Sequence, residues 1–346
     1  MQLPSHFGVL VRHLLMIIAV IFNMLKKLLI CQIITAKIVS LSEHLKFTKQ
    51  PLTRRLVFLS KWSDKKQYKD TTGAQGMINT STLKHSVQAY NLSASSENKI
   101  HDDSVAKRFG FKGGLVPGVE IYAYMIYPIV QHFGEEWLNN GYAECRLLKP
   151  VYDGAKTDII GDPLDNSLSL VVESLGERCA TGIAKLAASS SERKRIDFQE
   201  VELPEFEKRP QASKTSLPIG KTLGTFKQIM SREDQNQYLQ DVREPSKIFK
   251  KEGIIHPGWI LRLANRALSM NVLLGPWIHV GSEIQNITAA HVGQTIAAHA
   301  LVTNLYERKG HSFVEIDVSV IGEENSLLTQ IKHTAIYKPR QVKEAA

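Results

Sequence analysis

The sequence predicts an α+β protein in which one helix-and-sheet unit occurs twice. Two long apolar stretches, residues 117–140 and 256–274, each begin at or next to a Pro-Gly pair, and proline suits the first turn of a helix. Each stretch is followed by short strand-like runs with glycines between or beside them. Because the order and spacing of these elements agree, the chain is interpreted as an internal duplication.

The first unit is expected in residues 77–190. A strand over residues 82–94 leads into a polar loop, and the helix over 117–140 follows. That helix is apolar on most of its faces, so it is expected to be buried. Strands are then predicted at 143–152, 167–175 and 178–188.

The second unit is expected in residues 223–346, with its helix over 256–274. Strand-like stretches follow at 277–310, 311–321 and 329–339. Two local matches fix the register of the repeat: Pro257 follows Pro117 by 140 residues, and Gly293 follows Gly154 by 139 residues.

Residues 191–222 separate the two units. This segment contains three prolines and little hydrophobic periodicity, which is typical of an interdomain linker. Two units joined in this way can pair their sheets edge to edge, which removes exposed strand edges. A groove is then expected at the junction.

Residues 1–76 form an apolar and basic leader, with 12 of the 43 Lys and Arg residues and 3 of the 34 Asp and Glu residues. The apolar run from Leu14 to Leu25 is short for a membrane-spanning helix, which needs about 20 residues. Three interpretations stay open: an interfacial or signal anchor, a transit segment, or a stretch outside the mature protein, which then starts at Met77. Membrane contact is expected through residues 1–40 if the leader is retained, and the body is expected to be cytoplasmic.

The composition of the body excludes several classes of protein. Residues 77–346 hold 31 basic and 31 acidic residues, so no clustered basic patch indicates a nucleic-acid partner. Cys31, Cys145 and Cys179 are far apart and show neither metal nor redox spacing. The sequence has no phosphate loop and no zinc-ligand spacing.

The loop over residues 93–111 carries the pattern with the most chemical content. It has Asn98 and His101 three residues apart, and Gly118 follows at the start of the first long helix. This stretch resembles the hydratase motif of MaoC-like hotdog proteins, the (R)-specific enoyl-thioester hydratases and dehydratases. The motif runs Ser-Gly-Asp-x-Asn-Pro-Ile-His, and its counterpart here, with the family's Gly skipped, is Ser95-Ser96-Glu97-Asn98-Lys99-Ile100-His101, then Ala106, Gly110-Phe111 and Gly118.

The resemblance implies a double hotdog fold, with two long central helices that are each wrapped by an antiparallel sheet. It also implies acyl-CoA or acyl-carrier-protein thioesters as substrates, and no cofactor. In the family, the Asp and the His act on one water that adds to the enoyl thioester. The backbone at the helix start, here Gly118, stabilises the thioester carbonyl as it gains charge.

The sequence departs from the family at both predicted sites. Ser96 stands where the family has its Asp, and serine is no base near neutral pH, although it can hold a water. The second unit has the complementary defect, because Asp234 fits the motif but Leu239 stands at the position of the histidine. His256, before Pro257-Gly258, is an alternative imidazole for Asp234.

Several of these residues also have a structural explanation. Ser231 with Asp234 resembles a helix capping box, and His256 is equally consistent with a structural role. His279, His291, His299 and His311 lie in strand-like runs and are assigned no chemistry.

Three functions are consistent with the sequence. The first is a hydratase or dehydratase, with His101 and Asp234 as catalytic candidates and Ser96, Asn98, Gly118, His256 and Gly258 as substrate-binding candidates. The second is a non-catalytic acyl-thioester-binding protein that has lost the Asp/His pair. The third is a hotdog thioesterase. A homodimer is a further expectation.

Overall fold

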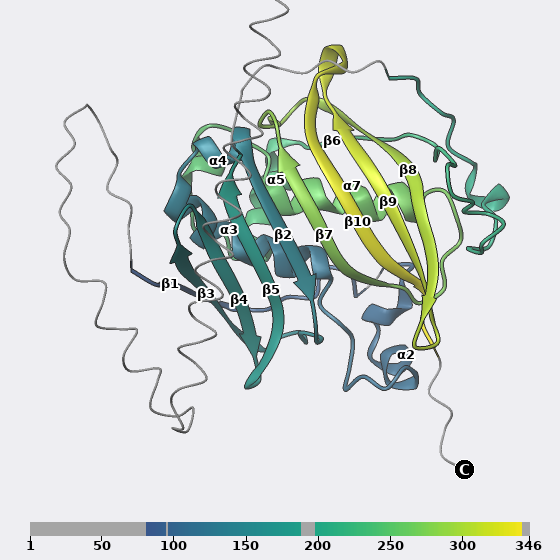
Figure 1. Ribbon diagram of the computed structural model, residues 1–346, viewed down its shortest axis with the longest axis horizontal. Coiled ribbons are helices and arrows are strands. Elements are labelled where there is room, and N and C mark those ends of the chain that lie inside the picture. The colour runs from purple at the N-terminus through teal and green to yellow at the C-terminus, as the bar shows by residue number, and fades with distance from the viewer. Residues whose placement is uncertain (1–80, 95, 188–197, 341–346) are drawn as a thin grey trace, which may run out of the picture. The chain divides into compact units, whose positions relative to one another are not determined.

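The computed structural model describes residues 81–94, 96–187 and 198–340 (Figure 1). The predicted leader, with its membrane contact, lies outside these residues. Within the described ranges, no helix is long and apolar enough to cross a membrane.

The N-terminal half holds one long helix and five strands. Its elements, in chain order, are β1 (Leu83–Gln88), η3 (Lys99–His101), α2 (Asp103–Arg108), α3 (Gly118–Phe133), α4 (Glu136–Asn140), β2 (Gly141–Leu147), β3 (Lys156–Leu164), β4 (Ser167–Ser174) and β5 (Glu177–Leu186).

The C-terminal half repeats this plan. Its elements are η4 (Phe206–Lys208), β6 (Phe226–Ile229), α5 (Arg232–Asp241), α6 (Lys247–Lys251), α7 (Pro257–Ser269), β7 (Ile278–Asn286), β8 (Thr295–Arg308), β9 (His311–Ile321), η5 (Glu323–Asn325) and β10 (Leu327–Lys338).

The ten strands form one antiparallel sheet in the order β1-β3-β4-β5-β2-β7-β10-β9-β8-β6. Each half contributes five strands in an equivalent order, and the two orders run in opposite directions from the central β2–β7 pair. At that pair, residues 142–146 of β2 lie opposite residues 281–285 of β7. The two sheets are therefore paired edge to edge, and the strands of the two halves follow the same plan.

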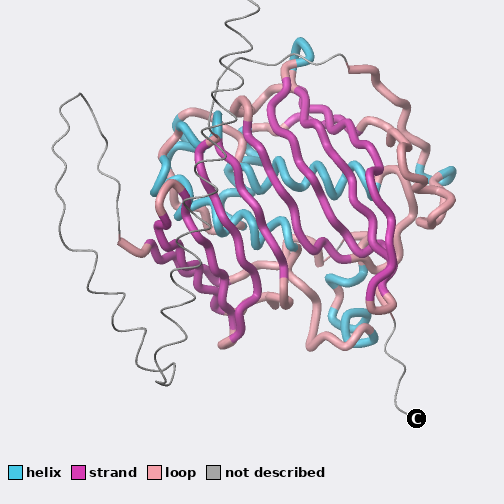
Figure 2. Tube along the Cα trace, viewed as in Figure 1, coloured by secondary structure: helices cyan, strands magenta, loops and turns pink. Residues whose placement is uncertain are grey.

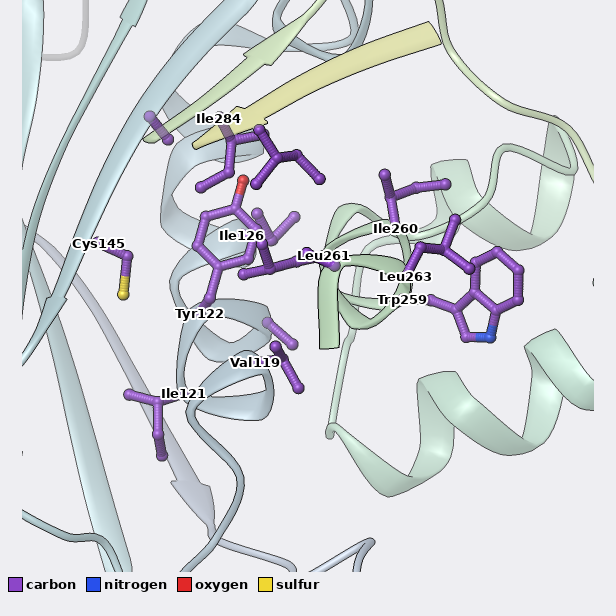
Figure 3. Close-up of a cluster of buried hydrophobic side chains, with 14 of the residues drawn as sticks. Val119, Ile121, Tyr122, Ile126, Cys145, Trp259, Ile260, Leu261, Leu263 and Ile284 are labelled. Carbon is purple, nitrogen blue, oxygen red and sulfur yellow. The ribbon is translucent and has the colours of Figure 1, made fainter. Parts of the chain in front are cut away.

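Helices α3 and α7 lie on one face of this sheet (Figure 2). Their side chains form one buried cluster, in which Val119, Tyr122 and Ile126 of α3 lie near Leu261 of α7 (Figure 3). Burying each side chain of the size of Ile126 contributes roughly 1.5–3 kcal/mol. The predicted fold, two long helices wrapped by antiparallel strands, is confirmed.

The two long helices also share one buried ion pair. Both Nε and Nη2 of Arg262 on α7 donate to Oε1 of Glu120 on α3, and the Nε bond is 2.7 Å long. The Glu120 side chain is fully buried, while that of Arg262 is 29% exposed. Burial raises the pKa of Glu120, and the nearby Arg262 opposes this shift. The two halves are therefore joined by charge as well as by apolar contact.

Two predicted elements differ from the structure. The apolar stretch 117–140 forms two helices because Gly134 has a φ of 69°, which ends α3. Residues 156–164 form β3, which was not predicted, because its Gly161 and Pro163 are typical of turns. Pro163 is tolerated since it lies next to the β3–β4 turn, opposite Leu168.

The described part of the predicted linker, residues 198–222, contacts the C-terminal half. Leu217 is fully buried. The backbone N–H of Ala212 donates to Leu273, and that of Leu273 donates to Pro210. This part of the segment therefore covers the C-terminal end of α7.

Candidate active site

The loop between β1 and α3 is anchored to the opposite half by Asn98. Its Nδ2 donates to the carbonyl oxygen of Trp277 at 3.0 Å, and its Oδ1 accepts from the N–H of Trp277 at 3.1 Å. Oδ1 also accepts from Ile100 N–H and thereby caps η3. One amide thus pairs with the backbone just before β7, across the junction of the two halves.

His101 lies at the end of η3 with both ring nitrogens in contact with the protein. Its Nδ1 is 2.6 Å from the carbonyl oxygen of Leu115, so Nδ1 carries a hydrogen and donates. Its Nε2 is 3.3 Å from Nδ2 of Asn98, which is a donor because of its bond to Trp277. Nε2 therefore has the lone pair, and the ring is the tautomer that can accept a proton there.

The protonation state of His101 follows from its surroundings. Burial lowers the pKa of the ring below its usual value, and the bond to Leu115 opposes this only in part. His101 is therefore a neutral base at pH 7.

Two acidic residues hold the loop in place. Asp102 accepts from the N–H groups of Ser104 and Val105 and caps α2. Asp103 accepts from the N–H of Gly114 at 2.6 Å. These carboxylates stabilise the loop and are not directed at His101 by any hydrogen bond.

A cavity of about 240 Å³ begins at His101 and extends under the start of α3. Most of its wall is apolar and comes from both halves. The lining includes Asn98, His101, Leu115, Pro117, Gly118, Ile121, Leu147, Val151, Asn265, Trp277, Ile278 and His279. The predicted groove at the junction is thus present as a cavity.

The N-terminus of α3 is open towards this cavity. Pro117 is its N-cap and offers no side-chain acceptor. Among the described residues, the N–H groups of Gly118 and Val119 have no hydrogen-bond acceptor. A Cβ at position 118 would lie 2.1 Å from Leu147 Cδ1 and 2.8 Å from His279 Nδ1, so only glycine fits there.

A second, more polar cavity of about 430 Å³ lies on the other side of His101. Asn98, His101, Pro117, Asn265 and Trp277 line both cavities. Ser96, Arg262 and Arg266 line only this one. The Ser96 hydroxyl donates to the carbonyl oxygen of Asn98 at 3.4 Å.

Three side chains of the C-terminal half form a buried chain behind the first cavity. His279 Nε2 and His333 Nδ1 each lie 2.9 Å from Oγ of Ser282, and the two imidazoles stack at 4.3 Å. Burial lowers the pKa of His279 to about 4 and that of His333 well below its usual value. Both rings are therefore neutral over the physiological range.

The equivalent region of the second half is closed. His256 is fully buried, its Nδ1 accepts from Gly258 N–H, and its Nε2 lies 3.2 Å from Glu244. A Cβ on Gly258 would lie 2.5 Å from Ala123 Cβ and 2.6 Å from the Tyr238 hydroxyl. The start of α7 is thus capped by its own histidine and packed against α3.

Asp234 lies apart from this cluster. It is exposed on the first turn of α5. Ser231 Oγ accepts from its N–H at 3.0 Å and donates to its carboxylate at 2.6 Å. Ser231 therefore caps α5, but the Asp234 carboxylate is bonded to the Ser231 hydroxyl and not to its backbone N–H, so only one half of the predicted capping box is present. His256 is hydrogen bonded to Glu244 rather than to Asp234.

The structure therefore brings together the predicted residues of the first half and separates those of the second. Ser96, Asn98, His101 and Gly118 lie around the two cavities, whereas Asp234 is on the surface and His256 and Gly258 are packed in the core. Sequence reasoning missed three lining residues, which are Asn265, Trp277 and His279. No local motif marks them, since they lie far along the chain from His101.

Groups of three or more His, Cys, Asp or Glu side chains that could hold a metal ion do not occur among the described residues. No protein-family model and no curated protein matches this sequence.

Solved structures do resemble it. A MaoC domain dehydratase from Chloroflexus aurantiacus superposes with a TM-score of 0.52 at 10% identity, covering 75% of this chain and 95% of its own. A MaoC-like dehydratase gives 0.51 at 12% identity, over 76% and 99% of the two chains. A Mycobacterium tuberculosis protein with a double hotdog fold gives 0.50 at 13% identity, over 74% and 96%. By its fold, this chain is a double hotdog protein.

Proposed function

We propose that this protein is a hydratase or dehydratase of enoyl or 3-hydroxyacyl thioesters, with one working site between its two halves. The observation that carries the proposal is the position of a neutral imidazole, His101, on the same cavity as the uncapped start of α3. A base and a carbonyl-binding site on one cavity are the two elements that hydration of an enoyl thioester needs.

The cavities support a placement for each part of such a substrate. The apolar cavity of about 240 Å³ fits an acyl chain. The N–H groups of Gly118 and Val119 are free to bind the thioester oxygen, which becomes negative as the enolate forms. The second cavity has Arg262 and the exposed Arg266 in its wall. Since Arg262 is paired with Glu120, Arg266 is the positive charge that would meet the phosphates of a CoA or carrier-protein arm.

A single imidazole can complete this reaction without the missing carboxylate. The water oxygen bonds to Cβ while Nε2 of His101 takes one water proton, and the double-bond electrons move into the enolate. The imidazolium then returns that proton to Cα, and the enolate collapses to the thioester. One water has been added, His101 is neutral again, and no second base is required.

A second candidate, a non-catalytic acyl-thioester-binding protein, has two observations in its favour. Asn98 already donates to Nε2 of His101, and Ser96 replaces the family's carboxylate. At 3.3 Å the Asn98 bond is long, so a water can compete with it. For this reason we favour the enzyme.

The test is hydration of short- and long-chain trans-2-enoyl-CoA by the full chain, with His101→Ala and the control His299→Ala. His299 is on β8 and lines neither cavity. We expect hydration by the wild type and the control, and a loss of about 100-fold or more in His101→Ala.

The alternatives give distinct results in the same samples. Binding of trans-2-enoyl-CoA without hydration would support the binding protein, and release of free CoA thiol would support a thioesterase. Either result would overturn the hydratase proposal.

A further inference from the structure

On α7, the side-chain amide of Asn265 has an oxygen without a hydrogen-bond partner in the protein. Its Oδ1 is buried and has no hydrogen-bond donor. By contrast, Asn271 makes three bonds, to the N–H and carbonyl of Gly224 and to the carbonyl of Ala267. Asn265 is thus a polar side chain that the C-terminal half presents without a protein partner.

The position of Asn265 indicates a functional role for this unpaired oxygen. It lines both cavities together with His101, which comes from the opposite half. Asparagine is a poor helix former in the middle of a helix, and a buried acceptor without a donor costs free energy. The polar side chain at this mid-helix position is explained if a molecule with a hydrogen-bond donor enters the cavity when the protein acts.

We propose that Asn265 holds the attacking water in place against His101 and so takes over the positioning role of the carboxylate that is missing at Ser96. This inference rests on the proposed hydratase function. The water donates one O–H to Oδ1 of Asn265 and the other to Nε2 of His101, which leaves an oxygen lone pair for Cβ. The proton moves only to His101, because an amide oxygen is not a base at neutral pH.

Other nearby groups are less suited to this role. The Ser96 hydroxyl is directed at the carbonyl of Asn98 and lines only the polar cavity. Glu97 is exposed. His279 is committed through Nε2 to Ser282, and its Nδ1 lies against Gly118. His279 Nδ1 is also unpaired, but His279 lines only the first cavity, and Glu97 lines only the polar one. Asn265 differs from both because its buried, unpaired acceptor belongs to a residue that lines the two cavities together with His101.

The experiment compares the full-length wild type with Asn265→Leu, Asn265→Asp and the matched control Asn304→Leu, which changes an exposed residue of β8 that lines neither cavity. Hydration of trans-2-enoyl-CoA is measured against pH, and the His101 pKa is measured by NMR in each protein. Leu keeps the size of Asn but cannot accept, whereas Asp restores a carboxylate acceptor.

We expect Asn265→Leu to lose about 100-fold or more in kcat with KM within threefold, which is the signature of an interaction made in the transition state. Asn265→Asp should keep at least a tenth of kcat and raise the His101 pKa, because a nearby negative charge favours the imidazolium. The acidic limb of the pH profile should move up with it, because His101 must be neutral to take the water proton. Asn304→Leu should match the wild type.

Three results distinguish failure of the inference about Asn265 from failure of the proposed function. An Asn265→Leu protein with kcat within threefold of an active wild type would overturn the inference and leave the proposed function intact. An unchanged His101 pKa in Asn265→Asp would overturn the inference whether or not the wild type is active. An inactive wild type in which Asn265→Asp raises the His101 pKa would overturn the function and support the placement of Asn265 beside His101.

Discussion

The buried His279–Ser282–His333 chain predicts that the protein loses stability on mild acidification. An unfolded imidazole takes up a proton near pH 6.5, while burial lowers the pKa of folded His279 to about 4. Between these values the unfolded state binds more protons, so the free energy of unfolding falls as the pH falls. The stabilisation is fully present above pH 6.5.

The expected loss in the free energy of unfolding follows from the two pKa values of His279. Each unit of pKa difference corresponds to about 1.4 kcal/mol, so lowering the pH from 7 to about 4.5 should remove about 2.5 kcal/mol through His279 alone. The pKa of His333 is lowered too, so its contribution has the same sign.

The assay is urea unfolding of the full chain at both pH values, followed by tryptophan fluorescence, for the wild type and His279→Gln. The variant keeps a hydrogen-bonding side chain but cannot titrate. Its loss of stability on acidification should be smaller than that of the wild type by about 2.5 kcal/mol. Equal losses would refute the reasoning, and His333→Gln provides the same comparison if His279→Gln does not fold.

Three further changes test other parts of the account. Gly118→Ala should destabilise the protein by about 1–3 kcal/mol in urea unfolding, because the new Cβ would overlap Leu147 and His279. Gly275→Ala should leave the stability unchanged, since no atom lies within 4 Å of its added Cβ. Equal effects of the two substitutions would contradict the close packing at the start of α3. Arg262→Met should cost about 3–5 kcal/mol, since Glu120 is left buried without its partner, and a thermal shift no larger than that of Ser269→Ala would contradict this. Ser96→Asp should raise kcat for hydration about tenfold by restoring a carboxylate beside His101; an unchanged kcat would show that position 96 does not reach the water.

Much of the fold could be predicted because its signals are local. The two Pro-opened apolar stretches gave α3 and α7, and the spacing of Gly154 and Gly293 gave the duplication. Both glycines have a positive φ in the turns that precede β3 and β8. Strand β3 was missed because Gly161 and Pro163 mimic a turn, although pairing with β1 and β4 makes the segment a strand.

The candidate site could be predicted only in half, since only half of it is contiguous in the sequence. Asn98, His101 and Gly118 belong to one motif near one helix start. Asn265, Trp277 and His279 come from the other half and reach the site through the β2–β7 pairing and the α3–α7 contact. On sequence alone they are typical of a helix and a strand.

At the second predicted site, the sequence motif is present but the structure has no open site. The Asp-x-Asn pattern at Asp234 is a helix cap, and the helix start at Gly258 is filled by Tyr238 and Ala123. A motif does not indicate whether the cavity around it has been closed by residues from elsewhere in the chain.

The central claim is that one site at the junction, above the start of α3, receives the acyl thioester. The most direct measurement is a crystal structure of the full chain with a saturated acyl-CoA, which cannot be hydrated. We predict that the thioester oxygen lies within hydrogen-bond distance of the Gly118 N–H, with the acyl Cβ next to His101 Nε2. An acyl chain bound near α5 and His256, or on the outer face of the sheet, would contradict the account.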